Sequence, residues 1–179
     1  MSQTPGLDVR VAALRQAFDE SFAAPPPEES QGLEDLLRIR VAGDPYAIRL
    51  RDIAGVVARR KVVPIPGGSS DFLGSAGIRG GIVPVFALAL LLGYDQAADL
   101  PSWMVLCGPD ESVALAFPEF EGYSRLPHSW IHVDDNLRPA SRHVKEVARM
   151  GLEFRPIISI PLIVATIRNR TGQTRSIDQ

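Results

Sequence analysis

The side chains best suited to metal or acid–base chemistry gather between residues 128 and 143. They are His128, His132, His143, Asp134 and Asp135. A zinc site needs its ligands on rigid elements with supporting hydrogen bonds, whereas the segment 127–139 is bounded by prolines and is predicted to be a loop. We therefore expect exposed loop histidines, with no metal or other cofactor. A serine hydrolase is also disfavoured, because no Gly-x-Ser-x-Gly elbow accompanies these residues.

A second candidate for chemistry is the glycine-rich stretch from residue 74 to 85, which reads GSAGIRGGIVPV. Gly74, Gly77 and Gly80 have the wrong spacing for a dinucleotide fingerprint, and a strand rather than a helix follows them. The stretch instead places Arg79 between a glycine turn and an apolar strand that contains a proline, which indicates an edge or a bulge. No general base, nucleophile or metal ligand adjoins this arginine in the sequence. We therefore expect it to recognise another protein rather than to take part in catalysis.

Arginines form two further candidate sites. Arg38 and Arg40 lie on the polar face of one predicted strand and Arg49 on that of its hairpin mate, so a matching register would join them in a cationic patch. Residues 59–61 (Arg-Arg-Lys) add a second cluster. A solvated face, docking of an acidic protein and binding of nucleic acid all remain open. Nucleic acid is the least favoured of the three, because no aromatic residues that would stack bases are interleaved with these cations.

The composition is that of an ordinary globular protein of 179 residues, with 45% hydrophobic and 22% charged residues and a net charge of −2. This balance selects neither nucleic acid nor an anionic membrane. Cys107 is the one cysteine, which excludes an intrachain disulfide and a cysteine metal cluster, and we expect a buried, inert thiol. The N-terminal residues lack the pattern of a signal peptide, and the apolar run 82–92 is too short to span a membrane. We therefore expect a cytoplasmic protein.

The elements that would position these residues begin with a predicted amphipathic helix at residues 8–23. Its apolar stripe consists of Val11, Leu14, Phe18 and Phe22, which recur at helical spacing. Three prolines at 25–27 end the helix and form an extended spacer. A helix this short is marginal in water, so its stripe should be buried on its own domain, on a partner or on a second copy. Leu14, Phe18 and Phe22 are therefore candidate docking residues, and residues 1–32 are predicted to be an N-terminal helix and linker.

From residue 36 the apolar period changes to two, which predicts β-strands. Residues 37–41 and 46–50 flank a turn at 42–45 and predict one hairpin, and residues 103–106 and 113–117 predict another. Further strands are predicted at 62–65, 82–85, 144–148 and 154–159, and short helices at 86–92 and 161–169. Many short strands between turn signals favour a barrel or a sandwich. Residues 170–179 are predicted to be a flexible tail.

In this pattern the chain resembles the CheW-like domains, the non-catalytic adaptors of bacterial chemosensory arrays. The family's opening hairpin has glycine, an acidic residue and tyrosine in its turn, and residues 37–48 (LRIRVAGDPYAI) match it. The central motif is Asn-Leu-Arg-Gly followed by Val-Pro-Val/Ile and Asp-Leu; residues 77–88 (GIRGGIVPVFAL) match it after Pro64, Pro66 and Gly74. Weaker matches follow, so the resemblance spans residues 36–168 and is most specific between 64 and 88.

The resemblance implies a mainly β fold of two small five-stranded β-barrels that share a hydrophobic core, formed by residues 33–169. It also implies an adaptor without an active site that couples chemoreceptor tips to a CheA-type histidine kinase. By position, Arg79 matches the motif arginine, a receptor-side contact, and Ile53, Ile82 and Val83 lie at or beside the same surface. Gly74 matches a glycine needed for the turn, and Val62 and Val63 lie near the face used toward the kinase.

Three positions depart from the family pattern. The motif asparagine is Gly77, the motif aspartate is Ala87, and an acidic residue common after the second strand is Gly55. The lost polar groups would normally face the partner, so partner choice is open to change. Two alternatives therefore stand beside the adaptor: a divergent scaffold of a non-motility pathway that docks through the N-terminal helix, and a small β-barrel that binds nucleic acid or an acidic ligand through the arginine patch. Self-association is also open.

Overall fold

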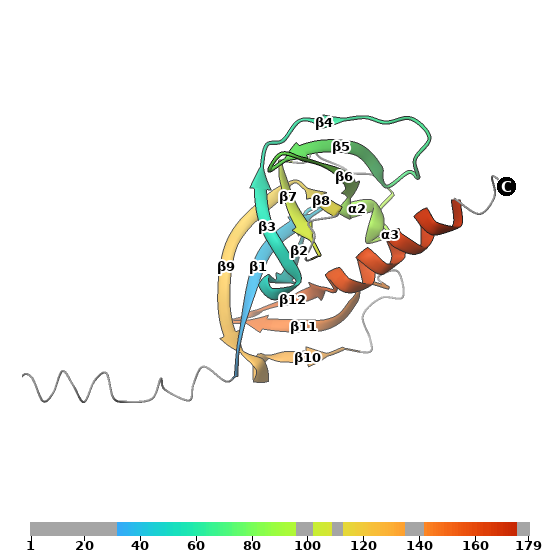
Figure 1. The fold of residues 1–179 in the computed structure, drawn as a ribbon. Helices are drawn as coiled ribbons and strands as arrows, with labels where there is room; N and C mark the ends of the chain where they lie inside the picture. Colours follow the sequence, from blue (N-terminus) through green and yellow to red (C-terminus); the bar gives the residue numbers. More distant parts are fainter. Residues whose placement is uncertain (1–31, 96–101, 109–112, 135–141, 175–179) are drawn as a thin grey trace, which may run out of the picture. The chain divides into compact units, whose positions relative to one another are not determined.

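The computed structural model describes residues 32–95, 102–108, 113–134 and 142–174 (Figure 1). The chain divides into two compact units, residues 1–33 and residues 34–179. The helix predicted at 8–23, with Leu14, Phe18 and Phe22, lies outside the described residues. The predicted division into N-terminal linker, domain and tail stays a prediction.

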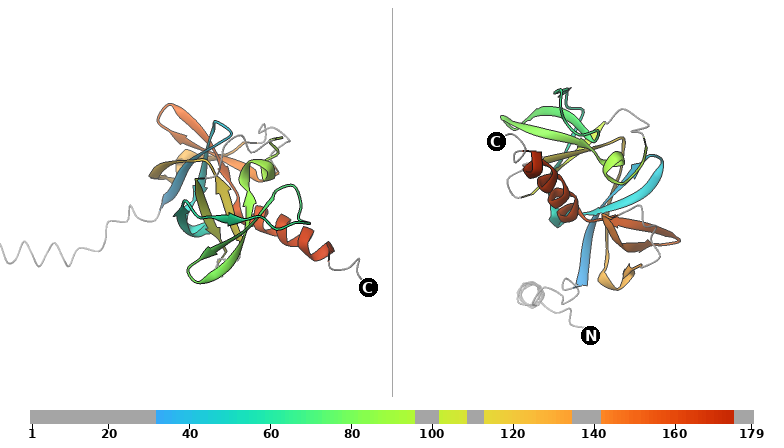
Figure 2. Two further views of the ribbon diagram at one scale, coloured as in Figure 1. Left: turned by 90° about the horizontal axis from the view of Figure 1, so that it is seen from above. Right: turned by 90° about the vertical axis from the view of Figure 1, so that its right-hand side faces the viewer.

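Within the described residues the strands form two curled, six-stranded sheets (Figures 1 and 2). Sheet A has the order β10-β11-β12-β2-β1-β9, with β1 Leu33–Val41, β2 Asp44–Arg49, β9 Glu119–Pro127, β10 Ile131–Val133, β11 Val144–Met150 and β12 Glu153–Ile158. Sheet B has the order β3-β7-β8-β6-β5-β4, with β3 Ile53–Ala58, β4 Val62–Val63, β5 Phe72–Ile78, β6 Gly81–Ala87, β7 Trp103–Cys107 and β8 Val113–Phe117.

Among the residues that the structure describes, four helical segments connect or follow these strands: η2 (Leu50–Asp52), α2 (Leu88–Leu91), η3 (His128–Trp130) and α3 (Ile160–Thr174). Pro161 occupies the first turn of α3, where its missing N–H leaves no intrahelical bond unmade. Among the described helices, none is long and apolar enough to cross a membrane.

Three apolar clusters stabilise this arrangement. The largest draws on both sheets and both α-helices, a second lies within sheet B, and a third lies within sheet A. Their central members are Leu37, Ile39, Leu115, Phe117 and Ile163 in the first, Ile78, Val85 and Leu106 in the second, and Leu36, Ala148 and Ile157 in the third. The mainly β fold of two curled sheets with a shared core is thus confirmed, although each sheet has six strands where five were expected.

Both predicted hairpins are confirmed, as β1–β2 and β7–β8. The first turn is tighter than expected, because Val41 pairs with Asp44 and leaves only Ala42 and Gly43 between the strands. The strands predicted from 62, 82, 144 and 154 are β4, β6, β11 and β12, and the two predicted helices are α2 and α3. Helix α3 continues to Thr174, into the segment predicted to be a tail.

Strands β3, β5, β9 and β10 were not predicted. In β5 the glycines were interpreted as a turn, yet this stretch is a strand that pairs with both β4 and β6. His132 lies in β10, so the segment predicted to be a loop is partly a strand. Pro84 lies in β6, an interior strand rather than an edge, and it is tolerated there because β8 pairs with β6 only from Val85 onward.

Candidate protein-interaction surface

Arg79 lies at the tip of the β5–β6 hairpin. Because Ile78 pairs with Gly81, the turn has two residues, and their φ angles are 49° at Arg79 and 81° at Gly80. Both angles belong to the left-handed region that a type I′ hairpin turn requires. That conformation costs a residue with a side chain about 1 kcal/mol, so glycine or asparagine would suit the turn better than arginine. Backbone preference therefore does not explain the arginine, which makes its side chain a candidate for recognition.

The Arg79 side chain reaches across to β3. A Cβ atom added to Gly55 would lie 3.2 Å from Nη2 of Arg79, which is closer than ordinary contact. The guanidinium therefore owes its place to the missing side chain at 55. The sequence singled out these two positions separately, one as the motif arginine and the other as a departure from the family pattern, and the fold makes them neighbours.

The outer face of strands β4, β5 and β6 carries uncharged and partly apolar side chains. The register places Val63 opposite Ser75, Ser75 opposite Pro84 and Gly77 opposite Ile82, so these side chains share one face. Ile82 is 84% exposed and Val63 is 56% exposed. We call the set Val63, Ser75, Gly77, Ile82 and Pro84 the outer face of sheet B. A face of this kind fits another protein better than it fits water.

The predicted contact residues do not all lie on this surface. Val83 is only 7% exposed and belongs to the apolar cluster of sheet B, because alternate residues of β6 point to opposite sides. Val62 also packs against that cluster, and Ile53 packs against the main core. Val83 is therefore a core residue, and the exposed members of the predicted set are Arg79, Ile82 and Val63.

Gly74 serves a different purpose from the one expected. It lies inside β5 at a register shift and not in a turn, with φ of 129°. A Cβ atom there would lie 2.1 Å from the Val63 carbonyl oxygen. Glycine is thus required both by the backbone angle and by the close approach of β4, which is what places Val63 on the outer face.

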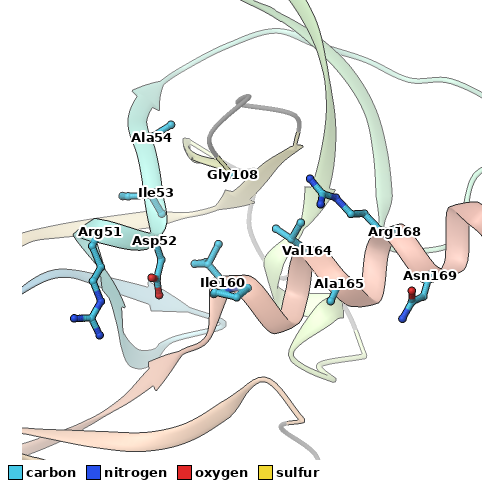
Figure 3. Close-up of a pocket in the computed structure, with 11 residues that line it drawn as sticks. Arg51, Asp52, Ile53, Ala54, Gly108, Ile160, Val164, Ala165, Arg168 and Asn169 are labelled. Atoms are coloured by element: carbon cyan, nitrogen blue, oxygen red, sulfur yellow. The ribbon is translucent and has the colours of Figure 1, made fainter.

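Ile53 lines a groove between β3 and α3 (Figure 3). The groove has a volume of about 660 Å³, and its apolar side chains include Ile160, Val164 and Ala165 of α3. Arg51, Asp52, Arg168 and Asn169 supply its polar groups. Burial raises the pKa of Asp52, more than the neighbouring arginines lower it. An apolar trough with charged margins suits a peptide or helix of a partner.

An aromatic cluster beside these elements has no counterpart in the sequence analysis. Trp103 of β7 lies 5.1 Å from Phe120 of β9, ring centre to ring centre, and Phe120 lies 5.3 Å from Tyr123. Tyr123 is 57% exposed. The pairing of Phe120 with Tyr123 was not predicted, because Glu121 and Gly122 between them interrupt the apolar pattern of β9 and the strand itself was not predicted.

The cationic patch predicted on the first hairpin is wrong for Arg40 and Arg49, because carboxylates of sheet A pair with both arginines. Arg40 Nε lies 2.6 Å from Glu121, and Arg49 lies 3.1 Å from Glu34 and 2.7 Å from Glu146. Although burial alone would raise it, hydrogen bonds from Arg155 and Arg40 hold the pKa of Glu121 below its ordinary value. Arg40 and Arg49 therefore contribute to ion pairs within sheet A rather than to an unpaired cationic surface.

The three histidines lie in different elements of the fold. His128 is in η3 and His132 in β10, whereas His143 is buried just before β11, where burial together with Arg170 and Arg142 lowers its pKa. Asp135 lies outside the described residues. Within the described part of the chain, no group of histidine, cysteine and acidic side chains could hold a metal ion. Burial raises the pKa of the Cys107 thiol to about 12, as expected for an inert side chain.

Comparison with known proteins agrees with this geometry. The model of the CheW-like domain matches residues 35–167. Among solved structures, the scaffolding protein TtCheW from Thermoanaerobacter tengcongensis has a similar fold, with a TM-score of 0.63 and 17% identity over 70% of this chain and 88% of that one. No curated protein matches the sequence. Since the family model covers most of the chain, including both sheets and the start of α3, this protein belongs to the CheW-like domain family.

Proposed function

We propose that this protein is a non-catalytic cytoplasmic adaptor that couples chemoreceptors to a CheA-type histidine kinase. The observation that carries the proposal is the β5–β6 hairpin, which holds Arg79 in a left-handed turn over Gly55 and beside the exposed Ile82. The arginine occupies the position of the family's receptor-side motif. A residue retained in a conformation that costs free energy is best explained by what its side chain binds.

The two partners would use different elements of sheet B. Arg79, Ile53 and Ile82 would meet the receptor, whereas Val62 and Val63 of β4 would meet the kinase. The two sets of residues do not overlap, so we expect the adaptor to bind both partners at once. Binding both raises their effective concentration and shifts the kinase between its conformations, with no bond made or broken by the adaptor.

The proposal is tested by binding of the full chain to a receptor cytoplasmic tip and to the regulatory domain of a CheA-type kinase. Arg79→Glu should weaken receptor binding about tenfold or more, as loss of a central arginine contact does, and should leave kinase binding intact. Val63→Asp should weaken kinase binding, because it places a charge on the strand expected to meet the kinase. Arg149→Glu, an exposed arginine in β11 of sheet A, is the matched control.

Thermal unfolding of each variant separates binding from folding. If Arg79→Glu lowered the melting temperature by several degrees as well as weakening receptor binding, the arginine would be structural. The proposal would then lose its main support. If the unaltered protein bound neither component, the coupling role would be wrong whatever the variants did.

A further inference from the structure

The turn between β3 and β4 carries the sequence Arg59-Arg60-Lys61, and all three residues are exposed. In the part of the chain that the structure describes, none of their side chains makes an ion pair or a hydrogen bond. The arginines of sheet A behave differently, since Arg40, Arg49 and Arg155 each meet at least one carboxylate. Among the described residues, three adjacent cations without a hydrogen-bonded or ion-paired partner are therefore a local feature of this turn.

The backbone of the turn is also unusual. Arg59 has φ of 46°, in the left-handed region that favours glycine. Its N–H donates to the Ser102 carbonyl oxygen at 2.8 Å, which fixes where the turn leaves β3. As at Arg79, a costly backbone conformation is combined with an exposed guanidinium.

The register brings this turn to the same end of sheet B as the β5–β6 tip. Val63 pairs with Ser75 and Val62 with Ala76, so the chain before Val62 continues toward the Ile78 end of β5. Arg59, Arg60 and Lys61 thus join Arg79 in what we call the cationic rim. The rim borders the outer face of sheet B, where Val63 is 56% and Ile82 is 84% exposed, and Ile65 beyond β4 is 50% exposed.

From this juxtaposition we propose that the cationic rim docks an acidic protein segment that also carries aliphatic side chains. The cations would meet its carboxylates, and Val63, Ile65 and Ile82 would meet its apolar residues. A protein segment fits better than a membrane or nucleic acid, because the chain as a whole has a net charge of −2 and repels an extended polyanion. A short acidic segment, in contrast, interacts mainly with charges within about one Debye length, roughly 8–10 Å, and those charges are the cations of the rim. The inference concerns the chemistry of the partner and holds whether or not that partner is a chemosensory protein.

The test uses the isotope-labelled full chain and a synthetic peptide in which pairs of glutamates alternate with single leucines. We expect the amide signals of residues 59–63 and 79–82 to shift on titration, and the affinity to fall as salt is added. Arg60→Glu with Lys61→Glu should weaken binding about tenfold, since each reversed exposed pair contributes a few-fold. The matched control is Arg149→Glu with Lys145→Glu, the same exchanges at exposed positions of β11 in sheet A, which should leave the affinity unchanged.

Other results would overturn the inference. Absence of peptide binding, signal shifts confined to sheet A, or equal losses in the rim variant and its control would each do so. Tighter binding of phosphatidylglycerol vesicles or of a short DNA duplex than of the peptide, lost in the same rim variant, would assign the rim to a lipid or a nucleic acid instead. The peptide contains no receptor or kinase sequence, so its failure and failure of the coupling role are separate outcomes.

Discussion

The two sheets carry the same kind of hairpin at matching places in their strand orders. In sheet A, β12 pairs in parallel with β2, which pairs with β1; in sheet B, β8 pairs in parallel with β6, which pairs with β5. Both hairpins turn through a left-handed residue followed by glycine, at Ala42–Gly43 in one and Arg79–Gly80 in the other. The two turns share a backbone conformation but differ in the side chains that surround them.

Hydrogen bonds within the chain anchor the first hairpin. Tyr94 donates a hydrogen bond to Asp44 at 2.5 Å and lies 2.8 Å from the Tyr46 hydroxyl, and Arg40 donates to the Gly43 carbonyl oxygen at 2.9 Å. The second tip sends its arginine over Gly55 and stands beside the exposed Ile82. The two turns thus share one geometry in different surroundings: hydrogen bonds from Tyr94 and Arg40 hold the first, and we propose that the second presents its arginine for recognition.

The largest effect is expected where the second hairpin meets β4. Gly74→Val should destabilise the protein by more than about 3 kcal/mol, because the left-handed φ and the clash with the Val63 carbonyl oxygen add together. Denaturant unfolding would measure it. Gly77→Val, in the same strand but with open space around its Cβ position, should change stability by less than about 0.5 kcal/mol. Equal costs at the two sites would mean that β4 does not pack as closely as described.

A second prediction concerns how the stability of each sheet depends on pH. Hydrogen bonding from Arg49 lowers the pKa of Glu146, and Arg155 and Arg40 lower that of Glu121 despite its burial. A carboxyl with a lowered folded pKa stabilises the fold fully above its unfolded value of 4.5, and that contribution is lost as the pH falls through the folded pKa. Between about pH 5 and pH 3 we therefore expect sheet A to lose amide-exchange protection before sheet B.

Charge removal provides the control for this pH effect. The double variant Glu121→Gln with Glu146→Gln should be less stable than the parent at neutral pH and should show a flatter acid dependence. Loss of protection in sheet B first, or the same acid profile in the double variant, would contradict the assignment of these ion pairs to the stability of sheet A.

A smaller effect tests the anchoring of the first hairpin. Tyr94→Phe should destabilise the protein by about 1.5 kcal/mol, because Asp44 loses its hydroxyl donor. Binding to any partner of sheet B should be unchanged, since the lost bond lies at the tip of sheet A. Thermal unfolding and a binding titration of the same sample would show both results, and weaker binding would indicate that the first hairpin is also a contact surface.

Much of this fold could be predicted because the strands of the shared core alternate in the usual way. The first hairpin has Leu37, Ile39 and Val41 on one face, and all three are buried in the main core, as this alternation predicts. Strand β5 was missed because its glycines, read locally, indicate a turn. What makes them suitable in a strand is the neighbouring chain, namely Val63 against Gly74, and that contact depends on tertiary structure.

The candidate site was predicted in part for the same reason. A motif located Arg79 and Ile82, since both follow from the spacing around one hairpin. Nothing local could place Val83 in the core, because only the pairing of β6 decides which alternate residues face inward. The arginines of the first hairpin were misinterpreted because their carboxylate partners are distant in sequence, with Glu121 and Glu146 on strands β9 and β11.

The smallest effect is the sharpest test of the comparison, because the two turns should respond alike in stability and differently in function. Arg79→Gly and Ala42→Gly each relieve a left-handed side-chain residue and should each stabilise the protein by up to about 1 kcal/mol. Only Arg79→Gly should lose partner binding, since it alone removes a side chain that we propose to contact a partner. Paired unfolding curves and binding titrations would measure this. If Arg79→Gly destabilised the protein, the arginine would belong to the fold, and the distinction between a structural and a recognition hairpin would fail at the residue on which it depends most.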